Sequence, residues 1–182
     1  ERIWQGESPT VFLPDPEKSG SLYKHTKINL RELTNRVKVI VEFDSTITEL
    51  KPQDLAVAVS SANGTINIDG SMPYNSPVIY YPQQNTVYTD NSVTWNFSML
   101  ELVTGYHNNL TINYPKTGQQ VFNGDLIGSI LMNTINGGIN LNCENDFTIK
   151  FVLKDYCAEC GTNFSCAIYV NNWLVHSYST DL

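Results

Sequence analysis

The sequence predicts an all-β protein, an antiparallel β-sandwich of the immunoglobulin-like or jelly-roll-like kind, preceded by an extended N-terminal tail. Three observations support this prediction. Apolar and polar residues alternate with a period of two in several short segments. Turn residues separate these segments at intervals of about 8–12 residues, as expected of a sandwich. Helical periodicity is scarce throughout the chain. A length of 182 residues and a hydrophobic content of 41% suit one domain with a buried core.

The strands can be expected in order along the chain. Four segments show clear alternation, at residues 37–43, 55–60, 93–99 and 147–153. Shorter β-prone runs between turn signals are at residues 65–68, 78–81, 111–114, 119–122, 126–132, 166–170 and 173–178. The dipeptides Asn63-Gly64, Asn123-Gly124 and Asn171-Asn172 are turn signals. Helical turns are expected only at residues 28–35 and 52–54.

The domain organisation predicted is a tail at residues 1–20 and a sandwich at residues 21–182. Pro9, Pro14 and Pro16 make the tail resemble a linker, but a solvated linker has no need of large apolar side chains. We therefore interpret the tail as a donor strand that completes the sheet of a neighbouring copy. The alternative is that it pairs within its own chain. The candidate donor residues are Ile3, Trp4, Thr10, Val11, Phe12 and Leu13.

Charge is distributed unevenly along the chain. Residues 52–182 contain three basic and ten acidic residues, and the whole chain has a formal net charge of −7. A protein of this charge lacks the basic footprint that nucleic acid or an anionic membrane requires. No apolar run is long enough to span a membrane. A surface rich in Asn, Ser, Thr and Tyr, on a chain that begins at Glu1 as a processed protein would, indicates a secreted protein at the cell surface.

Two sets of residues suggest extracellular modification. Four Asn-x-Ser/Thr sequons make N-linked glycans the expected attachments, at Asn63, Asn96, Asn109 and Asn163. An even number of cysteines predicts two disulfides of undetermined connectivity among Cys143, Cys157, Cys160 and Cys166. Redox chemistry at the Cys-x-x-Cys motif and zinc binding are the weaker alternatives, because the flanking segments are strands and the second cysteine pair has the wrong spacing.

No catalytic apparatus is visible in the sequence, so we expect no enzyme activity. His25, His107 and His176 are isolated. Glu101, Asp125 and Asp146 are among many conceivable carboxylates for glycoside hydrolysis, but nothing singles out a pair. Among metals the composition favours calcium over zinc, since acidic loops supply hard oxygen ligands, and the alternative is that these loop carboxylates are simply solvated. The loop carboxylates that could supply them are Asp44, Glu49, Asp69, Asp90, Glu144 and Asp146.

A resemblance to a known group rests on three segments. Residues 37–43, 50–52 and 55–65 resemble secreted archaeal surface-filament proteins, namely thread, bundling-pilus and cannula subunits. That resemblance implies β-sandwich subunits with N-glycans, which assemble by donor-strand complementation through an N-terminal extension. The cysteine cluster departs from the cannula pattern and favours the thread branch.

These observations predict a structural subunit of an extracellular filament, a homo-polymer in which each tail inserts into the next copy, serving adhesion or biofilm scaffolding. One alternative is a secreted, monomeric module that binds carbohydrate or a receptor, because exposed Tyr and Trp with Asn and Asp suit sugars. The other is a secreted hydrolase. The sequence leaves open whether the tail inserts in cis or in trans.

Overall fold

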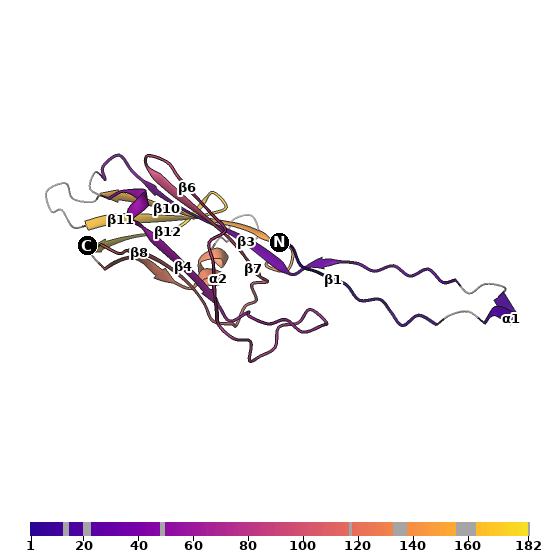
Figure 1. Ribbon diagram of the computed structural model, residues 1–182. Coiled ribbons are helices and arrows are strands. Elements are labelled where there is room, and N and C mark those ends of the chain that lie inside the picture. The colour runs from indigo at the N-terminus through magenta and orange to yellow at the C-terminus, as the bar shows by residue number, and fades with distance from the viewer. Residues whose placement is uncertain are drawn as a thin grey trace.

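The computed structural model describes residues 1–12, 15–19, 23–47, 50–116, 118–132, 138–155 and 163–181. Within these ranges the chain forms two sheets packed face to face and a long projection at one end (Figure 1). The six-stranded sheet has the order β12 (Trp173–Asp181), β11 (Asn163–Val170), β10 (Asp146–Asp155), β3 (Thr34–Phe43), β7 (Ser92–Leu100) and β6 (Asn85–Tyr88). The four-stranded sheet has the order β5 (Ile79–Tyr81), β4 (Ala56–Ser61), β8 (Asn108–Tyr114) and β9 (Gln119–Gly124).

The core lies between the two sheets because the alternating residues of each strand point inward. Val37, Val39 and Val41 of β3 are at most 1% exposed, and Trp95 of β7 lies beside them in the same buried cluster. The four-stranded sheet contributes Val59, Leu110 and Ile112 to that cluster, which therefore joins both sheets. Phe122 of β9 and Phe151 of β10 meet across the core with ring centroids 4.8 Å apart. The predicted all-β sandwich is confirmed.

One strand pair departs from a purely antiparallel sandwich. β3 and β10 run parallel, with Val39 opposite Ile149 and Val41 opposite Phe151, whereas the other sheet neighbours are antiparallel. A parallel pair needs a crossover between its strands. Here the chain passes through the four-stranded sheet and α2 (Leu126–Leu131) before it returns as β10. β3 thus lies in the middle of the larger sheet, flanked by strands distant in sequence.

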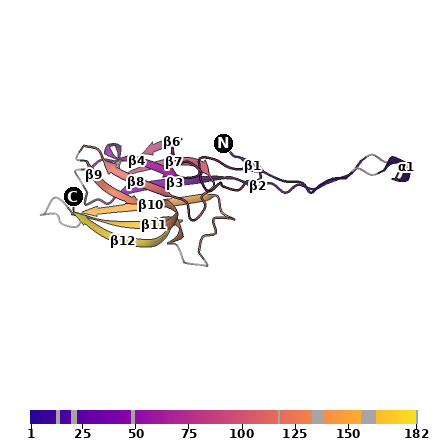
Figure 2. The same cartoon turned by 90° about the horizontal axis from the view of Figure 1, so that it is seen from below.

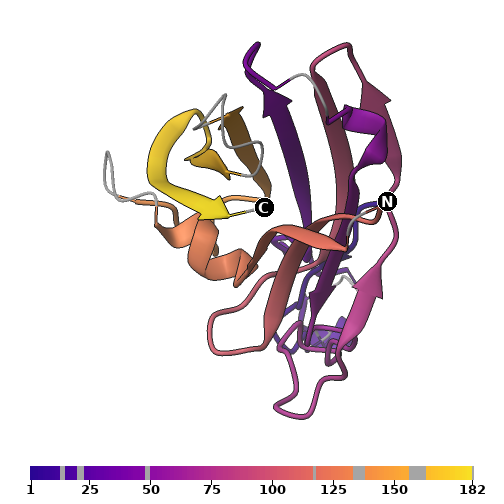
Figure 3. The same ribbon diagram turned by 90° about the vertical axis from the view of Figure 1, so that its left-hand side faces the viewer.

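Several local predictions were wrong, each for a physical reason. Residues 126–132 were expected as a strand, but Leu126–Leu131 form helix α2, which contacts one strand from each sheet, β8 and β10 (Figure 3). Asp125 caps this helix, since its Oδ1 accepts a hydrogen bond of 2.6 Å from the Gly128 N–H. Residues 28–35 are extended rather than helical, and residues 65–68 form a loop rather than a strand.

The turn predictions had mixed outcomes. Asn171 and Asn172 have positive φ angles of 47° and 71° between β11 and β12, so the predicted hairpin turn is confirmed. The predicted helical turn at residues 52–54 is the 3₁₀ helix η1 (Pro52–Asp54). Asn123 and Gly124, in contrast, belong to β9.

The N-terminal region is a hairpin-like projection rather than a simple tail (Figures 1 and 2). The chain begins beside the sandwich, leaves through β1 (Trp4–Gln5), passes the short helix α1 (Pro16–Ser19) at the far end and returns through β2 (Arg31–Glu32). We call residues 6–12, 15–19 and 23–30 the arm. We call the place where β1 and β2 meet the sandwich the root.

The core predicts a large difference between two phenylalanine-to-alanine substitutions. Phe151→Ala removes a fully buried ring and should lower the free energy of unfolding by about 3–5 kcal/mol. Phe12→Ala, at an arm position that is 75% exposed, should change it by no more than about 0.5 kcal/mol. Equilibrium unfolding in urea measures both. Equal losses for the two variants would contradict this description of the core.

Candidate functional site

The arm presents apolar side chains to solvent. On the outgoing leg Val11 is 37% and Phe12 is 75% exposed, and on the return leg Ile28 is 48% and Leu30 is 63% exposed. Beyond the root, residues 6–12 and 23–30 belong to no strand. Monomeric proteins seldom concentrate large apolar side chains on such an extension, and those that do commonly use them for contacts with other molecules. The arm is therefore the first candidate for a functional surface.

The two legs of the arm lie close together at Gly6. A Cβ at this position would lie 2.7 Å from side-chain atoms of both Ile28 and Leu30, and 3.0 Å from the carbonyl oxygen of Asn29. A larger residue at this position would have to displace the side chains of Ile28 and Leu30, so the glycine leaves room for the opposite leg. The legs are thus packed together where they leave the root.

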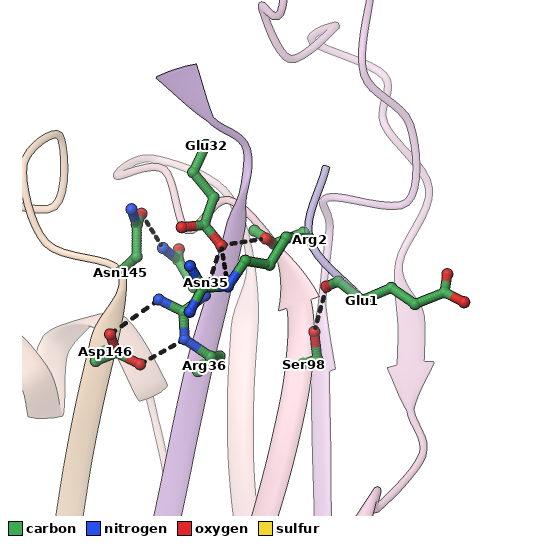
Figure 4. Close-up of polar contacts among 9 residues, drawn as sticks. Glu1, Arg2, Glu32, Asn35, Arg36, Ser98, Asn145 and Asp146 are labelled. Carbon is green, nitrogen blue, oxygen red and sulfur yellow. Dashed lines mark hydrogen bonds and ion pairs between the residues drawn. The ribbon is translucent and has the colours of Figure 1, made fainter. Parts of the chain in front are cut away.

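The root ties the first residues of the chain to its own sandwich. β1 and β2 pair in antiparallel register, with Trp4 opposite Glu32, and the Leu33 N–H donates a hydrogen bond of 2.8 Å to the carbonyl oxygen of Ile3. The Ser98 hydroxyl donates to the carbonyl oxygen of Glu1 at 3.3 Å (Figure 4). Ile3 and Trp4, which were candidates for insertion into a neighbour, therefore pair in cis.

The other candidate donor residues have a different placement. Thr10, Val11 and Phe12 lie on the outgoing leg, outside any strand. Leu13 lies outside the described residues. The exposed residues of the return leg were missed, since the sequence was interpreted as a tail with one leg. The signal that could have revealed them was the apolar pair Ile28 and Leu30, which we assigned to a helix.

A network of charged side chains holds the root in place (Figure 4). Arg36, near the start of β3, forms a bidentate ion pair with Asp146 of β10, with N–O distances of 2.5 and 2.8 Å. The remaining guanidinium nitrogen of Arg36, Nη1, lies 2.5 Å from Oε1 of Glu32, whose side chain is only 5% exposed. Glu32 also accepts a hydrogen bond of 2.9 Å from Thr34 and lies 3.7 Å from Arg2. One arginine therefore connects β2, β3 and β10.

A second arginine secures the opposite side of the root. Arg31 donates two hydrogen bonds, of 2.7 and 2.9 Å, to the buried carboxylate of Glu101, and a third of 3.0 Å to the carbonyl oxygen of Gly70. Both hydrogen bonds to Glu101 come from one nitrogen, Nη1, while Nη2 donates to Gly70, so the guanidinium group is held at two separate segments. The loop around Gly70 and the segment after β7 are thereby joined to the base of the arm.

The network favours the charged form of each of its three members. Burial raises the pKa of Glu32, but hydrogen bonds from Arg36 and Thr34 and the charges of Arg36 and Arg2 outweigh it and leave the pKa below its ordinary value of 4.5. Hydrogen bonding to Arg36 lowers the pKa of Asp146 below 3.8. The same contacts, with Asp146 first and Glu32 second, raise the pKa of Arg36. All three groups are charged at neutral pH.

The predicted glycan acceptors differ in accessibility. Asn63 is 1% exposed, its amide donates to the carbonyl oxygens of Leu100 and Glu101, and its Oδ1 accepts from the Tyr81 hydroxyl at 2.6 Å. An acceptor must be reachable, so burial removes Asn63 from the candidates. Asn96 and Asn109 are partly exposed on β7 and β8, and Asn163 lies in β11. Glycosylation at these three stays a prediction.

The structure does not bear out two disulfides. Cys143 is exposed and free, and two bridges would require all four cysteines. Cys166 is buried in β11, whereas Cys157 and Cys160 lie outside the described residues. Binding of calcium stays untested. Across the described ranges, no three His, Cys, Asp or Glu side chains lie close enough together to hold a metal ion.

The carboxylates considered for hydrolysis have structural contacts. Glu101 pairs with Arg31, Asp146 pairs with Arg36, and Asp125 caps α2. Absence of catalysis nevertheless stays a prediction. Among the helices in the described part of the chain, none is both long and apolar enough to cross a membrane.

Comparison with known proteins assigns the chain to a family. A profile of the fimbrillin-A associated anchor proteins Mfa1 and Mfa2 matches residues 1–179. The chain belongs to this family. The minor fimbrium anchoring subunit Mfa2 of Porphyromonas gingivalis is 34% identical over 180 residues, which cover 99% of this chain and 54% of that protein. The chain thus spans just over half the length of this relative.

Solved structures agree with the fold. The fimbrial anchor protein Mfa2 from Porphyromonas gingivalis superposes with a TM-score of 0.73 at 34% identity, covering 97% of this chain and 60% of that one. A candidate adhesin from Bacteroides thetaiotaomicron superposes with a TM-score of 0.67 at 16% identity, covering 85% and 56% of the two chains. The second likeness shows the fold alone.

The family corrects two predictions. The resemblance to archaeal filament proteins named the wrong group, because the matched relatives come from the bacteria Porphyromonas and Bacteroides. The broader expectation of a filament-associated protein is confirmed, since this is a family of fimbrial anchor proteins. The predicted homo-polymer is not supported, because the relative is an anchoring subunit.

The charged network predicts how stability depends on pH. Because the pKa values of Glu32 and Asp146 are lowered by folding, their contribution is present above their ordinary values and is lost as the pH falls through the folded values. Arg36→Gln removes the partner of both carboxylates. Its urea midpoint should therefore lie below that of the wild type at pH 7, and the two should converge below about pH 4.

The matched control is Lys51→Gln, which removes an exposed positive charge outside the root. Its midpoint should follow the wild type at every pH. A difference between Arg36→Gln and wild type that is the same at pH 7 and about pH 3 would contradict the role of the two carboxylates.

Proposed function

We propose that this chain is part of a fimbria-anchoring subunit at the bacterial cell surface, and that its arm docks onto a different fimbrial subunit. The observation that carries the proposal is the arm, whose apolar side chains are exposed although the root is held to its own sandwich. The family supports an anchoring role, and the relative named a minor fimbrium anchoring subunit matches over nearly the whole chain.

The exposed side chains supply a driving force for docking. Burial of Val11, Phe12, Ile28 and Leu30 in a partner would contribute about 1.5–3 kcal/mol for each side chain, before the cost of ordering is subtracted. A rigid base reduces that cost, because an element that is already oriented loses less freedom on binding. The contacts of Arg31 and Arg36 provide such a base.

The form of the contact follows from the extended backbone. Residues 6–12 and 23–30 have extended stretches outside any strand, which suits addition to the edge of a partner's sheet. Backbone hydrogen bonds would then give affinity, and alternate side chains would occupy pockets. This is donor-strand complementation in trans by the arm, while β1 remains paired in cis. Because the two surfaces differ, the contact is heterologous, as a junction between unlike subunits requires.

The test combines two substitutions on the outgoing leg, Thr10→Pro and Phe12→Asp. Proline removes a backbone donor, and aspartate replaces an apolar anchor with a charge. Purified protein is mixed with fimbriae isolated from the same bacterium and sedimented. We expect the wild type to co-sediment and the double variant to bind at least about tenfold more weakly, with an unchanged melting temperature.

Ile68→Asp is the matched control, since Ile68 is a fully exposed apolar residue outside the arm. It should bind as the wild type does. Unchanged co-sedimentation of the double variant would overturn the arm as the docking element. Absence of co-sedimentation by the wild type would overturn the anchoring role itself.

A further inference from the structure

The return leg of the arm carries positive charge that the rest of the described chain does not neutralise. Lys24 and Lys27 are both exposed, and residues 23–30 contain no acidic residue. Most other cations form an ion pair with a carboxylate, namely Arg2, Lys18, Arg31, Arg36, Lys116, Lys150 and Lys154. Among the described residues, Lys24, Lys27, Lys38 and Lys51 form none, and the first two lie only three positions apart on one segment.

The backbone of the return leg is unpaired as well. No backbone–backbone hydrogen bond joins residues 24–30 to another described residue. Every residue of this segment has an N–H group, because it contains no proline, whereas Pro9 interrupts the outgoing leg. Unpaired donors and acceptors on an extended segment are what a strand offers to the edge of another sheet. Of the two legs, the return leg is therefore better suited to such pairing.

The apolar side chains of the return leg share one side. A Cβ at Gly6 would lie 2.7 Å from side-chain atoms of both Ile28 and Leu30. This agrees with an extended backbone, in which side chains point alternately to opposite sides. By the same alternation, position 24 falls on the side of Ile28 and Leu30, and position 27 falls on the other. A partner strand beside this leg would meet one cation on each side.

We propose that the return leg adds to an open sheet edge of an acidic fimbrial subunit, where carboxylates beside an apolar pocket pair with Lys24 and Lys27. The inference rests on the docking proposed for the arm and names the chemistry of its partner. Backbone bonds of residues 24–30 extend the partner's sheet, and Ile28 and Leu30 occupy the pocket. The two lysines speed the encounter and exclude partners with a positive edge, since rim charges act mainly on association rate and specificity.

A second copy of this chain lacks such an edge. Of the outermost strands of the two sheets, β5, β6 and β9 contain no Asp or Glu, and β12 contains one, at its last residue. The carboxylates of Glu42, Asp44 and Asp54 already pair with lysines of their own chain. The acidic edge therefore belongs to a different subunit.

An anionic membrane fits the arm less well, because the far end of the arm is not positive. Asp15 and Glu17 lie there with a single cation, Lys18, whose ammonium is 3.6 Å from Asp15 (Figure 1). A membrane reached by the far end would meet these carboxylates before the return leg. Segments that bind anionic lipid also use about four to eight Lys or Arg residues, and the return leg has two lysines.

The first test uses co-sedimentation with isolated fimbriae. The double variant with Lys24→Gln and Lys27→Gln should bind about fivefold more weakly than the wild type in about 50 mM NaCl, the loss expected for two exposed ion pairs. In about 500 mM NaCl the difference should fall below about twofold, because salt screens exposed charges.

The matched control is the double variant with Lys38→Gln and Lys51→Gln. It removes the same charge from the other two cations without an ion pair in the described chain, and both lie outside the arm. It should bind as the wild type does at both salt concentrations. Equal loss in the two double variants would assign the effect to net charge and overturn the proposal, as would unchanged binding of the Lys24 and Lys27 variant.

The second test concerns the backbone of the return leg. Alternate N–H groups of an added strand point toward its partner, so one of the adjacent positions 25 and 26 supplies a donor. His25→Pro and Thr26→Pro are made separately, and one of them should bind fimbriae at least about threefold more weakly, with an unchanged melting temperature. Unchanged binding of both variants would overturn the addition of this leg to a sheet.

Two other partners are distinguished by direct measurement. Flotation of the wild type with phosphatidylglycerol vesicles, lost with Lys24→Gln and Lys27→Gln, would assign the leg to a membrane. A dimer of the wild type in sedimentation velocity, lost with the same substitutions, would assign the leg to a second copy. Either result would overturn the proposal.

The inference and the proposed function can fail separately. If Thr10→Pro with Phe12→Asp abolishes co-sedimentation while Lys24→Gln with Lys27→Gln preserves it, docking by the arm stands and the acidic partner is overturned. Absence of co-sedimentation by the wild type would overturn both.

Discussion

The constraint on which the rest of the structure depends is that the chain leaves and re-enters the sandwich at one place. Arg31 and Arg36 fix this place through carboxylates on three separate segments, namely the buried Glu32 and Glu101 and the exposed Asp146. Because the root is closed in this way, the first strand does not need a partner from another molecule. The arm beyond it has no packing role in the sandwich and is available for contacts outside it.

Because of this constraint, the core and the root have different roles. The core between the sheets supplies stability through residues such as Val39, Trp95 and Phe151, whose side chains are at most 1% exposed. β3 joins the core to the root, since it carries the core valines and also Arg36 of the charged network. In the anchoring role proposed above, a projection based on the central strand of the larger sheet would transmit force directly to the core.

The sequence predicted the sandwich well because alternation is a local signal. Residues 37–43, 93–99 and 147–153 became β3, β7 and β10 almost within their predicted bounds. The sequence predicted the structure poorly where tertiary contacts decide the local conformation. Residues 126–132 have β-prone side chains, yet the Asp125 cap and burial between the sheets favour a helix. The return leg of the arm could not be predicted, because Arg31–Glu101 and Arg36–Asp146 join residues 70 and 110 positions apart.

The loss of charge beyond Lys51 was visible in the sequence, but its meaning required the fold. Three basic and ten acidic residues in 131 positions could have been scattered evenly. The register instead places Lys150 opposite Ile40 on the larger sheet and leaves Thr111 and Asn109 among neutral neighbours on the smaller one. Solubility alone does not require such segregation, since mixed charges on both faces would serve it equally. The segregation is therefore a property of the strand register, which no single segment of the sequence displays.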